Sequence, residues 1–155
     1  MDSTWIVSAN GGRARIFAQH RGTDALEEIN DMVNAPAREP VRATETDSLG
    51  QRVDGRGRPG ANAPTSENGY QPHQTPAQHQ EELFARDVAH FLIHAHDEGR
   101  FKELCLFAAP GFLGVLRREM KDKLHGAIRL EIDKDYTRAR ADDLKRHVQE
   151  RLRPH

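Results

Sequence analysis

The sequence predicts an α/β domain built on a mixed β-sheet. One observation is the continuous apolar run Leu104–Ala109, which breaks at Pro110-Gly111 into an amphipathic helix that reaches Met120. A strand without polar alternation is buried on both faces, so helices must cover both sides of the sheet. A second observation is a pair of short apolar runs near the amino terminus, joined by the turn sequence Asn10-Gly11-Gly12. Together they indicate a hairpin next to a parallel, helix-covered strand.

Length and charge favour one domain over residues 1–155. The chain carries 23 basic and 24 acidic residues, and 36% of it is hydrophobic. Some part of the chain therefore contributes little to the core. With a net charge of -1, any contact with nucleic acid must come from a local basic patch and not from the field of the whole protein.

The sequence predicts a cytoplasmic protein with no contact to membranes. The amino terminus lacks a basic region followed by a long apolar segment, and no window approaches the roughly 18 apolar residues of a membrane span. The single cysteine, Cys105, lies in the apolar strand and fits a reducing compartment. It is interpreted as a small core residue and not as a nucleophile, which would need an exposed, electropositive setting.

Three strands are expected before the first helix. Trp5–Ala9 and Ala14–Ala18 form the hairpin, and Leu26–Val33 forms the third strand. Glu27 and Glu28 disturb the alternation of the third strand. We expect it at an edge of the sheet, where charges oppose unwanted pairing.

Residues 34–76 form a long excursion from the domain. Six of the eight prolines and five of the twelve glycines fall here. Such a connection is usually a functional loop or a disordered one. Its arginines combine with a flexible backbone in a composition suited to phosphate contacts, while a solvated linker with balanced charge is the alternative.

The first helix is expected from about Ala77 to Glu98, ending before Gly99. Its apolar stripe consists of Phe84, Val88, Phe91, Leu92 and Ala95. His90 and His94 share a face, but zinc needs three or four ligands, so we interpret them as surface residues and predict no metal site.

The carboxyl-terminal part is expected to hold one more strand and one more helix. Ala127–Ile132 alternates apolar and charged residues, as a strand does. Thr137 is the expected N-cap of the last helix. The buried stripe of that helix is Ala141, Leu144, Val148 and Leu152.

The order β-β-β-α-β-α-β-α predicts the topology. Two right-handed crossovers give a five-stranded mixed sheet in the order 3-2-1-4-5, with strand 2 antiparallel and three flanking helices. This is a ribonuclease H-like arrangement. Its strand ends at Asn10 and at Pro110-Gly111 lie side by side, where a helix amino end favours negative charge.

The same positions argue against catalysis. A two-metal nuclease needs carboxylates on the first and fourth strands, but these end in Ser8-Ala9-Asn10 and Phe107-Ala108-Ala109. The chain has no G-x-S-x-G elbow, P-loop or dinucleotide fingerprint. The sequence favours a non-catalytic protein without a cofactor.

Several segments carry a resemblance to a known family. Trp5–Val7, Gly12–Phe17, Asp47–Arg52, Phe84–Ala89 and Ala108–Arg117 look like those of the bacterial host attachment proteins, described as "protein required for attachment to host cells". The Ala-Pro-Gly-Phe-Leu-Gly-x-Leu-Arg run and the Asp-Lys-Asp-Tyr-Thr run at 133–137 are the most specific parts of the match.

That family is in turn similar to the middle domain of archaeal and eukaryotic class I release factors and of Pelota. In release factors the loop before the first helix carries Gly-Gly-Gln, which enters the ribosome and assists hydrolysis of peptidyl-tRNA. Here the loop reads Leu49-Gly50-Gln51-Arg52, with leucine in place of the first glycine. A side chain at that position weakens the case for hydrolysis.

The resemblance implies a release-factor-like module that binds the ribosome or structured RNA. The alternatives are a protein-interaction or adhesion-related factor that uses the exposed faces of the first and last helices, and a residual peptidyl-tRNA hydrolase with Gln51 as its catalytic candidate. The candidate binding residues are Asp47, Gly50, Gln51, Arg52, Arg56, Arg58, Pro110, Gly111 and Arg117.

Overall fold

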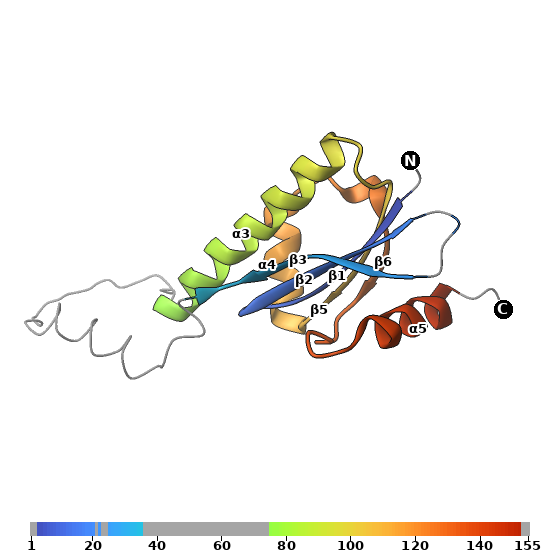
Figure 1. Cartoon of the computed structure of the whole chain (residues 1–155). Helices are drawn as coiled ribbons and strands as arrows, with labels where there is room; N and C mark the ends of the chain where they lie inside the picture. The colour runs from blue at the N-terminus through green and yellow to red at the C-terminus, as the bar shows by residue number, and fades with distance from the viewer. Residues whose placement is uncertain (1–2, 21, 23–24, 36–74, 153–155) are drawn as a thin grey trace, which may run out of the picture. The chain divides into compact units, whose positions relative to one another are not determined.

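The computed structural model describes residues 3–20, 22, 25–35 and 75–152. Figure 1 labels the strands and helices. In chain order the elements are β1 (Ser3–Asn10), β2 (Arg13–His20), β3 (Glu27–Val33), α3 (Pro76–Asp97), β5 (Glu103–Ala108), α4 (Pro110–Met120), the short 3₁₀ turn η2 (His125–Ala127), β6 (Ile128–Ile132) and α5 (Ala141–Leu152).

The five strands form one sheet in the order β3-β2-β1-β5-β6, which confirms the predicted topology. β2 pairs antiparallel with both β1 and β3, whereas β5 pairs parallel with β1 and with β6. The mixed sheet is therefore ribonuclease H-like in strand order and direction. β3 lies at one edge, as expected, with Glu27 and Glu28 exposed.

A side chain stabilises the hairpin turn between β1 and β2. Asn10 pairs with Arg13, so Gly11 and Gly12 form a two-residue turn. The Asn10 side-chain oxygen accepts hydrogen bonds from the backbone N–H groups of Gly12 and Arg13, at 2.8 and 2.9 Å. Neither glycine has a positive φ. Asparagine mimics the backbone here, so the turn does not depend on the left-handed freedom of glycine.

Helices cover both faces of the sheet, as the buried strand predicts. α3 and α4 lie on one face and α5 on the other (Figure 1). β5 is buried from Leu104 to Ala108, because its even-numbered residues face α3 and α4 while Cys105 and Phe107 face α5. Each large apolar side chain removed from water in this way stabilises the fold by roughly 1.5–3 kcal/mol.

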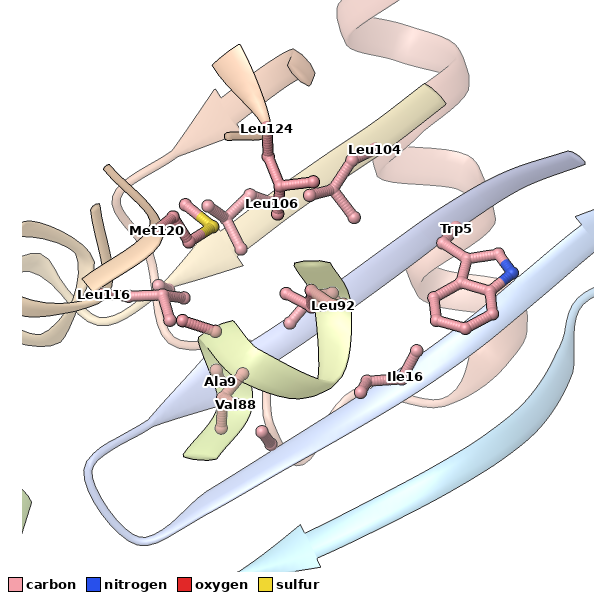
Figure 2. Packing of buried hydrophobic residues seen from close by; sticks show 14 of the residues in the cluster. Trp5, Ala9, Ile16, Val88, Leu92, Leu104, Leu106, Leu116, Met120 and Leu124 are labelled. Carbon is pink, nitrogen blue, oxygen red and sulfur yellow. The ribbon is translucent and has the colours of Figure 1, made fainter. Parts of the chain in front are cut away.

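The larger cluster of buried residues lies under α3 and α4. Figure 2 shows Leu116 and Met120 of α4 gathered with Leu106 of β5 and with Leu124. Trp5 packs against the ring of Phe101, with centroids 4.7 Å apart. The smaller cluster joins Ile6, Phe17, Cys105 and Phe107 to Leu144 and Val148 of α5.

The chain divides into two compact units. One comprises Met1–Asn34 and Glu81–His155 and contains the sheet, and the other comprises Ala35–Gln80. A single domain with a loop excursion at 34–76 stays a prediction. Among the helices of the described ranges, none is long and apolar enough to cross a membrane.

One sequence expectation about a helix end is wrong. Thr137 does not cap the last helix, because α5 begins four residues later at Ala141. The Thr137 hydroxyl instead donates to the Asp135 carboxylate at 2.7 Å and accepts from the Asn10 side-chain amide at 3.2 Å. The local sequence does not reveal this contact, because Asn10 lies 127 positions before Thr137.

Candidate functional site

The carboxyl end of β1 is one of the two strand ends that the predicted topology places side by side. Side chains of the protein itself fill the space at this end. The Asn10 side-chain amide donates to the Asp135 carboxylate at 2.9 Å. Partial burial raises the pKa of Asp135, but hydrogen bonds from Asn10 and Thr137, helped by the charge of Arg138, outweigh it and leave the pKa below its usual range. These bonds stabilise the carboxylate form.

Arg15 joins the same network from β2. Its guanidinium donates to the backbone oxygens of Thr137 and Ala139, at 3.0 and 2.6 Å. It also binds both carboxylate oxygens of Glu28 on β3 and lies 5.0 Å from the centre of the Phe17 ring. These bonds hold the segment before α5 against the sheet. The side chains at the carboxyl end of β1 therefore have a structural role.

The second strand end lies where β5 passes into α4. Ala109 occupies the N-cap position with no side-chain cap, and Pro110 starts the helix. Pro110 and Gly111 are exposed, and a methyl group added at Gly111 would meet nothing within 4 Å. Both residues are accessible to solvent. That they bind RNA or a partner stays a prediction.

A cavity of about 490 Å³ lies at the other end of α4, beside β6. A pocket of this volume is in the range that holds small ligands. Basic, acidic and apolar side chains share its wall. The lining residues are Gly114, Arg117, Arg118, Met120, Lys121, Asp122, His125, Ile128 and Glu131.

The cations of this cavity are only partly neutralised. The Arg117 guanidinium lies 3.6 Å from the Glu131 carboxylate of β6. Arg118 and Lys121 are exposed, and within the part of the chain that the structure describes neither forms an ion pair. Asp122 is the second carboxylate of the lining. The lining thus carries three permanent cations and two carboxylates, a net charge of +1 before any charge on His125.

Lys121 has an unusual backbone. Its φ of 54° and ψ of -139° end α4, while its N–H donates to the oxygen of Arg117 at 3.0 Å. Among the described ranges it is the non-glycine residue with a positive φ. Such a conformation costs of order 1–3 kcal/mol and tends to occur at functional sites. The sharp turn sends the chain back along the cavity towards His125 and β6.

Among the candidate residues that the structure describes, one lies at this cavity. Arg117 lines it, but Pro110 and Gly111 do not. Asp47, Gly50, Gln51, Arg52, Arg56 and Arg58 lie outside the described residues. Sequence reasoning missed Arg118, Lys121 and His125. The many basic residues that follow Arg117 in the sequence are a signal for these three. The sequence gives no such signal for the opposite wall on β6, because that wall depends on the parallel pairing of β6 with β5.

The side chains that line the cavity are mostly charged or titratable. Its polar lining consists of cations, carboxylates and one histidine, which attract or repel charge. Cys105 lies elsewhere in the core, and burial raises the pKa of its thiol to about 11, so it stays protonated. No group of three or more His, Cys, Asp or Glu side chains placed to hold a metal ion occurs within residues 3–20, 22, 25–35 and 75–152.

Comparisons with known proteins give a family and a distant structural likeness. The crystal structure of the type II variant of the Aquifex aeolicus Ppx/GppA phosphatase matches with a TM-score of 0.41 and 11% sequence identity. The match covers 85% of this chain and 35% of that one, so this chain spans about a third of the length of that protein. A search of curated proteins found no match. The model of one family, described as "protein required for attachment to host cells", matches residues 5–148. Since that match covers nearly the whole sheet, α3, α4 and most of α5, the chain belongs to the family of proteins required for attachment to host cells.

Proposed function

We propose that this protein is a non-catalytic module that binds structured RNA, with the ribosome as its main target, and that it affects attachment to host cells indirectly. The observation that carries the proposal is the set of exposed cations at the end of α4, Arg117, Arg118 and Lys121, around a cavity of ligand size. Phosphate groups are the natural partners of clustered arginine and lysine side chains.

The charge distribution supports this reading. The chain has a net charge of -1, so it has no overall attraction for a polyanion. A local cluster of unpaired cations then supplies the attraction, and each phosphate that it neutralises releases counterions into solution. Arg118 and Lys121 meet that requirement, since no carboxylate of the described chain neutralises them.

The segment at 34–76 carries a second set of proposed phosphate-binding residues. Arg52, Arg56 and Arg58, with Asp47, Gly50 and Gln51 beside them, stand at the position where release factors carry their ribosome-binding loop. This part rests on the resemblance of the sequence to the release-factor middle domain. Guanidinium groups on such a loop form bidentate bonds to phosphates.

Co-sedimentation with ribosomes in a sucrose gradient tests the proposal. Two triple-alanine variants, one at Arg117, Arg118 and Lys121 and one at Arg52, Arg56 and Arg58, should each reduce the ribosome-bound fraction several-fold. The matched control replaces Arg140, Arg146 and Arg151 with alanine. These residues are exposed on or next to α5, so the control removes the same charge from the other face of the sheet.

Three results would contradict the proposal. One is a ribosome-bound fraction that neither cluster changes, or that only the α5 control changes. Another is recovery of one dominant protein partner that survives nuclease treatment, which would favour a protein-interaction role. Turnover of peptidyl-tRNA that falls on Gln51→Ala would replace the non-catalytic reading with a hydrolase.

A further inference from the structure

We infer that the cavity between α4 and β6 receives a terminal phosphate, that is, a phosphomonoester of nucleotide size. The inference rests on the proposed function and narrows it, because it says which phosphate of an RNA these residues recognise. The same group occurs at the 5′ end of an RNA and on a free nucleotide, and the two sources can be told apart by experiment.

The size and the lining of the cavity fit a small ligand that carries both apolar and anionic groups. Its volume is about 490 Å³, and its lining includes the apolar side chains of Met120 and Ile128. Met120 is almost fully buried and continues into the main core, whereas Arg118 and Lys121 are exposed. A lining that combines apolar and cationic side chains fits a ligand that has a base or sugar as well as a phosphate.

The balance of charge distinguishes a terminal phosphate from an internal one. Glu131 partly neutralises Arg117, which leaves Arg118 and Lys121 as the uncompensated pair. A phosphomonoester carries about -1.5 to -2 charges at pH 7, whereas each internal phosphate of an RNA carries one. Since Asp122 also lines the cavity and the lining carries a net charge of +1, the more highly charged monoester is attracted more strongly than an internal phosphate.

The two carboxylates of the lining strengthen this distinction. Asp122 and Glu131 share the wall with the cations. A continuous RNA backbone through the cavity would bring several phosphates past both carboxylates, and like charges at close range repel. The acids therefore oppose the passage of a continuous RNA backbone through the cavity.

The backbone at Lys121 fixes this arrangement. The positive φ at Lys121 ends α4, and the turn that follows leads into η2, so that Arg118 before the turn and His125 after it line the same cavity. A helix that simply continued would carry the later residues away at about 1.5 Å per residue. The strained turn therefore concentrates cationic side chains at one point.

The experiment compares ligands that differ only in a terminal phosphate. With the full chain, fluorescence anisotropy measures binding of one RNA oligonucleotide carrying either a 5′-phosphate or a 5′-hydroxyl group, and calorimetry compares AMP with adenosine. We expect the phosphorylated member of at least one pair to bind about tenfold tighter, the effect of one or two charge-assisted hydrogen bonds.

Three variants and a control test whether the cavity is responsible. Lys121→Gly and Arg118→Gln should reduce the preference for phosphate about tenfold, while Glu131→Gln should increase phosphate affinity several-fold, because it frees Arg117 and removes a repelling carboxylate. Arg146→Gln, an equal loss of charge on α5, should change nothing. Thermal unfolding of each variant shows whether the fold is intact.

The outcomes are separable. A preference confined to the oligonucleotide pair supports an RNA end as the source, and one confined to AMP supports a free nucleotide. Equal binding of phosphate and hydroxyl forms in both pairs, or a preference that Arg118→Gln and Lys121→Gly leave intact, overturns the inference. If the protein does not bind ribosomes but still prefers the phosphorylated ligand, the proposed ribosomal function is wrong. Binding of a free nucleotide then remains.

Discussion

Asn10 connects three parts of the protein through one side chain. Its oxygen closes the β1–β2 turn, and its amide reaches Asp135 and Thr137 ahead of α5. From the sequence, Asn10 is a turn residue at the end of a strand. The structure adds the long-range contacts, because β1, β5 and β6 run parallel and the Asp-Lys-Asp-Tyr-Thr run that follows β6 therefore lies at the same end of the sheet as Asn10.

We expect Asn10→Ala to lower the free energy of unfolding by about 1–3 kcal/mol, since two turn N–H groups and the Asp135 carboxylate lose a partner together. Urea denaturation measures the change. Asn30→Ala is the control, because Asn30 accepts a single local bond from the N–H of Asp31 on the edge strand. An equal loss in both variants would contradict the role assigned to Asn10.

Asp135 gives the protein a sensitivity to acid. Its folded pKa is lowered, so the unfolded state binds the proton more readily, and the stabilisation is complete above the ordinary aspartate pKa of about 4. It is lost as the pH falls through the folded pKa. Asp135→Asn should therefore be less stable than the natural protein at pH 7, and the difference should shrink below about pH 4.

Denaturation curves between pH 3 and pH 7 measure this effect. The exposed neighbour Asp133 supplies the control, and Asp133→Asn should follow the natural protein at every pH. A constant gap between Asp135→Asn and the natural protein across this range would show that the carboxylate is not held by these hydrogen bonds.

At the scale of elements, α4 carries both a core face and the cavity. Phe112, Leu116 and Met120 are buried against the sheet, while Arg117 and Arg118 point to the cavity side. This division follows the helical period, so it could be predicted from the sequence. The reversal at Lys121 could not, because lysine gives no local signal for a positive φ.

We expect Lys121→Gly to raise the free energy of unfolding by roughly 1 kcal/mol, because glycine adopts this backbone without strain. Thermal denaturation measures the gain. Lys123→Gly is the matched control and should be neutral or destabilising, since Lys123 has no positive φ and glycine adds freedom to the unfolded chain. A loss of stability in Lys121→Gly would contradict the strain assigned to this turn.

The strands show where sequence prediction succeeds. β5 was recognisable because its residues are buried on both faces, and β3 because its charges suit an edge. Thr137 shows where it fails. A threonine four residues before a helix resembles an N-cap, but Asp135 and Asn10 use its hydroxyl instead.

At the scale of the whole molecule, a net charge of -1 makes the local cluster decisive for binding a polyanion. The logarithm of the RNA-binding constant should fall linearly with the logarithm of salt concentration, and Arg118→Gln should reduce the slope by about one. Arg146→Gln should leave it unchanged. A slope that is the same in all three proteins would place the phosphate contacts elsewhere.

The sequence by itself determined the fold class, the order of the strands and the two covered faces of the sheet, because these depend on which residues are apolar and at what spacing. It also named Arg117, which is among the candidate binding residues that accompany the family resemblance. Only the tertiary structure decided that Arg117, Arg118, Lys121 and His125 face Glu131 across one cavity. That arrangement requires the parallel β5–β6 pairing and the reversed backbone at Lys121, and both bring together residues whose proximity no local pattern encodes.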